Sequence, residues 1–162
     1  MMIKKTPLFL GIMLTFGVSY TALADALPSQ AKQASHAQYS IDMYKSPTCG
    51  CCGKWADHLR QSGFEVIEHK RDDMTAVKAQ YGVPNKLSSC HTALIDGYII
   101  EGHVPAADVE RLLKERPNIA GLTAPGMPMK SPGMQDVGQK PEGYDVLAFT
   151  HDGTTTVFHH YP

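Results

Sequence analysis

The chain has 162 residues, with 15 basic and 16 acidic side chains and a formal net charge of −1 when histidine is neutral. This near balance provides no excess basic charge for nucleic acid or an anionic lipid surface, and the length suits one folded domain. Cysteine usage is the unusual part of the composition, because three of the four cysteines lie between Cys49 and Cys52.

The first residues have the layout of a secretory signal peptide. A pair of lysines precedes an apolar run over residues 8–18, and a small-residue cleavage site follows at residues 22–24. The apolar run is short and interrupted for a membrane span. We therefore expect residues 1–24 to be removed and residues 25–38 to form a flexible polar leader. The exported chain is expected to be periplasmic, with no stable membrane span after cleavage.

Strand and helix patterns alternate from residue 39 onward. The expected elements, in chain order, are a strand over residues 41–45, a helix that starts just after Cys49 and runs to about residue 61, a strand over residues 64–69, a helix capped by Asp72 or Asp73 that ends near residue 81, a hairpin over residues 92–101 and a helix over residues 105–116. The turn Asp96-Gly97 is the strongest hairpin signal. This order predicts an α/β, thioredoxin-like core over residues 39–117.

A shorter segment follows this core, over residues 118–162. It begins with a loop rich in Met, Pro and Gly over residues 121–138. A second hairpin is expected over residues 144–158, around the turn Asp152-Gly153. This segment is too short for a hydrophobic core of its own, so we expect the loop and the C-terminal β-hairpin extension to pack on the thioredoxin-like core.

The cysteines support two competing functions. Cys49 and Cys52 form a C-x-x-C pair at the start of a helix, where unpaired N–H groups and the helix dipole stabilise a thiolate. A dithiol oxidoreductase needs only this pair, and it usually has a cis-proline where this chain reads Ser-Ser-Cys-His-Thr over residues 88–92. Cys90 stands there instead, within reach of the other three in the expected fold. Four convergent cysteines favour metal binding.

The identity of the metal follows from the ligand types. Thiolate and thioether sulfur favour Cu(I), although a site of four thiolates also suits Zn²⁺. Cys51 and Cys52 are neighbours on a helix and point about 100° apart. We therefore expect them to bridge different ions, which favours a cluster of more than one Cu(I) over one tetrahedral zinc.

Methionine and histidine residues extend the set of candidate ligands. The exposed Pro/Gly loop carries Met127, Met129 and Met134, whose thioethers bind Cu(I), although methionine more often fills gaps in a core. His91 follows Cys90 directly and is a candidate for ligation or proton handling near the sulfurs. His103 is a weaker candidate.

Two further groups are better explained by ordinary structure. His151, His159 and His160 could form a separate Cu(II) site, but adjacent residues on a strand point to opposite faces, and exposed histidines are the simpler interpretation. Trp55 could cover the cysteines, but its helical spacing with Leu59 favours core packing.

Several uncommon strings occur together in one order. They are Cys-Gly-Cys-Cys-Gly-Lys-Trp from Cys49, Ser-Cys-His-Thr from Ser89, Asp-Gly-Tyr from Asp96, Glu-Gly-His-Val-Pro from Glu101, and the Pro-Gly-Met strings that end at Met127 and Met134. In these strings the chain resembles the CopG-type periplasmic copper-resistance proteins, over about residues 43–134. The resemblance implies a thioredoxin-like copper protein that works beside efflux and oxidase systems, with the four cysteines as ligands and redox chemistry at the cluster. Met129 and the C-terminal hairpin lie outside the matching pattern.

The sequence therefore predicts a periplasmic protein of copper resistance that binds Cu(I), with more than one ion per chain. Its predicted metal ligands are Cys49, Cys51, Cys52, Cys90, Met127, Met134 and His91. One alternative is a thiol-disulfide oxidoreductase in which Cys49 attacks and Cys52 resolves. A structural zinc domain is the other.

Overall fold

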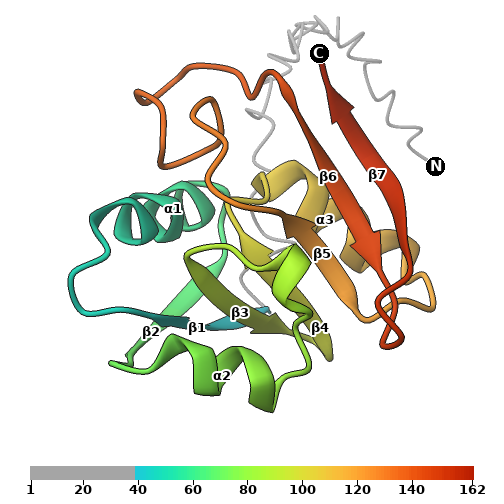
Figure 1. The fold of residues 1–162 in the computed structure, drawn as a ribbon. Coiled ribbons are helices and arrows are strands. Elements are labelled where there is room, and N and C mark those ends of the chain that lie inside the picture. Colours follow the sequence, from blue (N-terminus) through green and yellow to red (C-terminus); the bar gives the residue numbers. More distant parts are fainter. Residues whose placement is uncertain (1–38) are drawn as a thin grey trace, which may run out of the picture.

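A single mixed β-sheet runs through residues 39–162, the part of the chain that this computed structural model describes (Figure 1). The elements are β1 (Ser40–Lys45), α1 (Gly50–Gln61), β2 (Glu65–Lys70), α2 (Met74–Gln80), a 3₁₀ turn at Asn85–Leu87, β3 (His91–Ile95), β4 (Tyr98–Gly102), α3 (Ala106–Glu115), β5 (Gly121–Ala124), β6 (Tyr144–Phe149) and β7 (Thr155–Tyr161). The predicted signal peptide and leader lie outside the described residues. Among the described helices, none is long and apolar enough to cross a membrane.

The sheet has the strand order β2-β1-β3-β4-β5-β6-β7. The pairs β1–β2 and β4–β5 are parallel, and the other neighbours are antiparallel. In Figure 1, α1 and α2 lie on opposite sides of the strands β1 and β3. The hydrophobic residues divide accordingly, since Ile100 belongs to the large core cluster with α1 and α3, while its neighbour Ile99 packs in a smaller cluster. Successive residues of a strand point to opposite faces, so one strand serves both clusters.

The sequence patterns predicted the ends of most helices and strands to within one or two residues. The helix that begins after Cys49 ends at Gln61, and the Asp96-Gly97 turn joins β3 to β4. Asp73 is the N-cap of α2, because its Oδ1 accepts a hydrogen bond from the backbone N–H of Ala76 at 3.0 Å. The sequence pattern had left Asp72 and Asp73 as equal candidates for this role.

The start of the expected Met/Pro/Gly loop is instead a strand. The segment β5 is fully buried between β4 and β6, and it joins the C-terminal hairpin to the rest of the sheet. Gly121 lies so close to β4 that a Cβ there would overlap the carbonyl oxygen of Ile99. The assignment of Gly121–Ala124 to a loop was therefore wrong. Four residues with a glycine carry little strand preference of their own, and pairing on both sides makes this segment a strand.

A histidine connects the first helix to the third. The Nε2 atom of His58 on α1 accepts a hydrogen bond from the backbone N–H of Ala106, the first residue of α3, at 3.1 Å. Burial lowers the pKa of His58 below its ordinary value of 6.5. Protonation would remove this acceptor, so the contact requires the neutral imidazole.

We expect the thermal stability of the protein to fall as the solution becomes acidic. The unfolded chain binds a proton at His58 more readily than the folded chain, so this contribution is complete above about pH 6.5 and is lost as the pH falls toward the folded pKa. His58→Gln should reduce the loss of Tm between about pH 7.5 and pH 5 by about 3 °C. Thermal melts followed by circular dichroism test this, and an unchanged pH dependence in the variant would contradict it.

Candidate metal centre

The cysteines meet because two neighbouring strands end at the same place. Lys45, the last residue of β1, pairs with His91, the first residue of β3. The chain beyond β1 turns through residues 46–48 to Cys49, the N-cap of α1, and the chain before β3 supplies Cys90. The antiparallel register therefore places Cys90 beside the first turn of α1, as the expected fold required.

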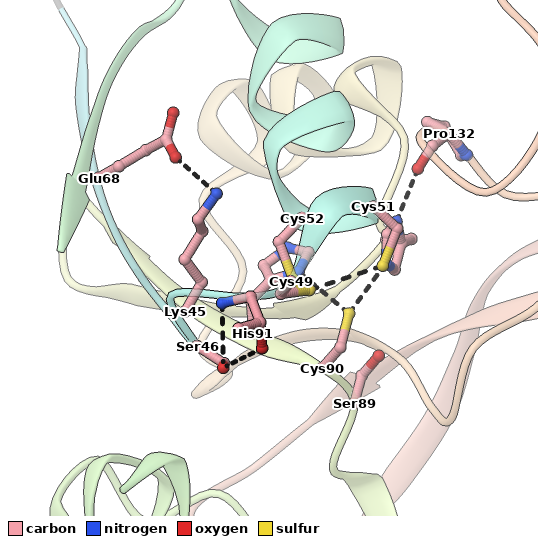
Figure 2. Close-up of a disulfide and its surroundings, with 12 residues drawn as sticks. Lys45, Ser46, Cys49, Cys51, Cys52, Glu68, Ser89, Cys90, His91 and Pro132 are labelled. Atoms are coloured by element: carbon pink, nitrogen blue, oxygen red, sulfur yellow. Dashed lines mark hydrogen bonds and ion pairs between the residues drawn. A yellow bond between two sulfur atoms is a disulfide. The ribbon is translucent and has the colours of Figure 1, made fainter. Parts of the chain in front are cut away.

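All four sulfur atoms lie within 4.8 Å of one another. Figure 2 shows Cys49, Cys51, Cys52 and Cys90 facing a common centre, with Cys49 and Cys52 joined by a disulfide. The Cys51 sulfur is free and lies 3.6 Å from that of Cys49. The C-x-x-C pair is thus present in its oxidised form, and its reduction would provide four thiols at one place.

The sulfurs of Cys51 and Cys52 lie close enough together to share one ion. The 100° angle between neighbouring residues suggested that Cys51 and Cys52 would rarely approach one ion, yet their sulfurs fall within the same 4.8 Å group. Two metal–sulfur bonds of about 2.3 Å span nearly this distance. The angle therefore does not exclude a shared ion, because side-chain rotation at the first turn brings the sulfurs together.

A second group of ligand atoms shares Cys90 with two histidines. His103 was predicted to be a weaker candidate than His91, but its Nε2 lies 2.9 Å from the sulfur of Cys90. Its Nδ1–H donates a hydrogen bond to the carbonyl oxygen of Pro132 at 2.7 Å, so Nε2 presents a lone pair toward Cys90. Metal-bound histidines are commonly oriented by such a bond from the other ring nitrogen. Only the position of the Pro132 carbonyl reveals this, and no local sequence signal points to it.

His91 lies on the other side of the same thiol. Its Nδ1 is 3.4 Å from the Cys90 sulfur, and its Nε2 is buried with no hydrogen-bond partner among the described residues. The ligand atoms of Cys90, His91 and His103 lie within 4.8 Å of one another. The nitrogen that faces the thiol is Nδ1, so this is the atom through which His91 could bind a metal ion together with Cys90.

The electrostatic environment keeps these groups neutral. Burial is the main cause that lowers the pKa of His91 and of His103, so both imidazoles have a free lone pair at neutral pH. Burial, with the nearby Cys51, raises the pKa of Cys90 to about 12. A metal ion that binds Cys90 must therefore displace its proton.

The two Pro-Gly-Met strings pack beside different cysteines. The backbone of Gly126, just before Met127, pairs with Ser88 and Ser89 next to Cys90. Gly133, just before Met134, lies against the backbone of α1 near Cys51. Met127 and Met129 are 58% and 71% exposed, and Met134 is half-buried. The loop methionines thus belong to segments that adjoin the sulfurs.

Trp55 and the histidines of the C-terminal segment lie outside the groups of metal-ligand atoms in the described part of the chain. Trp55 is fully buried, and its indole N–H donates to the carbonyl oxygen of Val104 at 2.8 Å, which confirms core packing. His159 and His160 bind carboxylates instead of the sulfur site, with Nδ1 2.7 Å from Asp108 and Asp145 respectively. In residues 39–162, neither group of metal-ligand atoms includes these histidines or His151.

The fold and the site together define an α/β protein with a mixed seven-stranded sheet and a cysteine–histidine cluster capable of binding metal. A solved structure described as copper resistance protein copG, form 2, is 45% identical to this chain, with a TM-score of 0.70, and the match covers 76% of this chain and 98% of that one. Form 1 gives 46% identity and the same TM-score, with 76% and 97% covered. The chain belongs to the CopG copper resistance protein family.

A family model agrees with this assignment over part of the chain. Residues 87–134 match the family described as "Protein of unknown function, DUF411". This range includes Cys90, both buried histidines and the two Pro-Gly-Met strings. No curated protein matches the chain.

Proposed function

We propose that this protein binds Cu(I) at the cysteine cluster as part of copper resistance, with more than one ion per chain. The observation that supports this most directly is the convergence of four cysteine sulfurs on one end of α1, with two neutral histidines sharing Cys90. With the thioethers of Met127 and Met134, the candidate donors outnumber the four ligands of a single tetrahedral ion. Sulfurs that bridge neighbouring ions would use them all.

The ligand types favour Cu(I) over zinc. Thiolate and thioether sulfur are soft ligands, and neutral imidazole is accepted by copper as well. We assign the ligand set to Cys49, Cys51, Cys52, Cys90, His91, Met127 and Met134, and we add His103 because its Nε2 faces Cys90. In this proposal copper is the cargo of the protein.

Organisation and location follow the same proposal. Residues 39–117 would form the thioredoxin-like core and residues 118–162 an extension that carries the methionines. The signal-peptide pattern over residues 1–24 supports export to the periplasm. There the protein would meet copper efflux or oxidase proteins, which are its proposed partners.

Anaerobic titration of the reduced protein with Cu(I), followed by metal analysis, tests the proposal. We expect more than one copper per chain in the natural sequence. Cys90→Ala should lower that number, because Cys90 is shared by both groups of ligand atoms. His160→Ala is the matched control, since His160 lies on β7 and binds Asp145. Unchanged loading in Cys90→Ala, or one zinc with no preference for copper, would contradict the proposal.

The disulfide supports a second candidate function. Cys49 and Cys52 are bonded in the arrangement that a thiol-disulfide oxidoreductase uses, and Cys49 stands at the N-terminus of a helix. A protein in which Cys51 and Cys90 are replaced by serine should then still catalyse the reduction of a model disulfide without metal, when an added dithiol keeps the Cys49–Cys52 pair reduced. The absence of turnover in that variant would contradict this second candidate function.

A further inference from the structure

We propose that Glu101 is the positioning residue of the copper site, holding the backbone before Cys90 in place through a buried carboxylate. This inference rests on the proposed copper function and adds to it the group that fixes the fourth cysteine. Glu101 lies on β4, and its side chain is 0% exposed. Its hydrogen bonds go to the segments that flank Cys90 and to a lysine, so its role in the site is indirect.

The carboxylate binds the chain on both sides of Cys90. Its Oε1 accepts a hydrogen bond from the backbone N–H of Ser89 at 2.6 Å. Its Oε2 accepts one from the hydroxyl of Thr92 at 2.7 Å. A single rigid group thus holds the residue just before Cys90 and the residue two positions after it.

The sheet alone cannot provide this support. The register of β3 with β4 begins at Thr92, so the backbone of Ser89 lies beyond the ladder that joins these strands. The partly buried N–H of Ser89 needs an acceptor outside that ladder, and the Glu101 carboxylate supplies it. Ser89 also donates from its hydroxyl to the carbonyl of Gly126, next to Met127. Glu101 therefore secures the Cys90 segment and, through Ser89, the first Pro-Gly-Met string.

A lysine from α2 makes the burial of this carboxylate tolerable. Lys78 on α2 forms an ion pair with Glu101, and its side chain is 13% exposed. Its ammonium also donates to the Thr92 hydroxyl at 3.1 Å. A buried carboxylate without a partner would be strongly unfavourable. The ion pair with Lys78 explains why the Glu101 carboxylate can be buried. The hydrogen bond from the Ser89 N–H explains how that carboxylate acts on the Cys90 segment.

The test compares two double variants that differ in whether residue 101 keeps polar atoms for the Ser89 N–H and the Thr92 hydroxyl. Glu101→Ala alone would leave the charge of Lys78 without a partner, so both charges are removed together. Lys78→Met with Glu101→Gln keeps a carbonyl oxygen that can accept from Ser89 N–H. Lys78→Met with Glu101→Leu has similar volume and no acceptor. Asp108→Asn is the control for general destabilisation, because Asp108 is a buried carboxylate that binds His159 and Tyr161 away from the cysteines.

We expect the glutamine double variant to bind Cu(I) with an affinity close to that of the natural sequence in competition with a Cu(I) chelator. The leucine double variant should bind roughly tenfold more weakly, because the Ser89 N–H and the Thr92 hydroxyl both lose their partner at residue 101. Asp108→Asn should lower the Tm without changing the Cu(I) affinity. Equal affinities of the two double variants, with both folded by circular dichroism, would overturn the role of Glu101.

A measurement without copper separates this inference from the proposed function. In a Cys51→Ser background with the Cys49–Cys52 disulfide intact, Cys90 is the one free thiol in the chain. Its rate of alkylation should be higher with Leu than with Gln at position 101, because the segment is less constrained. A difference in this rate supports the positioning role even if the natural protein shows no Cys90-dependent copper binding, and equal rates contradict it.

Discussion

Gly133→Ala is expected to lower the free energy of unfolding by about 2–4 kcal/mol. A Cβ at this position would meet the backbone nitrogen of Trp55 at 2.7 Å and the backbone oxygen of Cys51 at 2.8 Å. Both atoms belong to α1 and cannot move without disturbing the helix turn that carries the cysteines. The φ of Gly133 is also +86°, which disfavours any other residue.

Gly138→Ala separates these two causes. Gly138 lies in the same loop with a φ of +87°, but nothing would contact its Cβ within 4 Å. We expect it to cost only about 1–2 kcal/mol, from the backbone conformation alone. Chemical denaturation of both variants measures the difference. Equal losses would show that the close packing of Gly133 on α1 does not contribute.

Gly133→Ala should also weaken copper binding. Displacement of the loop would move the Pro132 carbonyl away from Nδ1 of His103, and it would move Met134 with it. The orientation of the imidazole toward Cys90 would then be lost. Gly138→Ala should retain the natural Cu(I) content per chain, so metal analysis of the same two variants completes the comparison.

Oxidation of the Cys49–Cys52 pair is expected to abolish binding at the four-cysteine site. Thiolate is the form that binds metal, and a disulfide removes two of the four thiolates. Cys51, Cys90 and the histidines would remain, which is too few soft ligands for the bridged cluster. We expect the disulfide form to retain at most one Cu(I) per chain and to regain the full number after reduction.

The measurement is anaerobic Cu(I) loading of the oxidised and the reduced protein, with the thiol state checked by mass spectrometry after alkylation. Cys49→Ser combined with Cys52→Ser is the matched control, because it removes the same two thiols without adding a covalent bond. This variant should bind as little copper as the disulfide form. Full loading of the oxidised protein would show that copper binds elsewhere.

Much of the fold could be predicted because its signals are local. Asp96-Gly97 specifies a turn through its own backbone preference, and Asp73 caps a helix because its carboxylate accepts a hydrogen bond from a backbone N–H only three residues later. The strand β5 could not be predicted in this way. Its four residues become a strand because β4 and β6 supply hydrogen-bonding partners from 20 or more positions away.

The candidate site could likewise be predicted only in part. Thiol and thioether chemistry is a property of residue type, so the cysteines and the preference for a soft metal follow from the sequence. Which histidine is the better candidate ligand does not follow from the sequence. His103 faces Cys90 only because Pro132, 29 positions later, accepts its Nδ1–H. His91 has a nitrogen without a partner among the described residues because the ring is buried against Trp55.

The amino-acid sequence by itself determined the chemistry of this protein: four cysteines, two Pro-Gly-Met strings, and a helix that begins just after Cys49. The tertiary structure alone decided which groups act together. The sulfurs converge, the Ser89 N–H meets Glu101, and Gly133 packs on α1. The physical reason is that ligand preference and turn conformation depend on a few adjacent residues, whereas the distance between two side chains depends on every element packed between them.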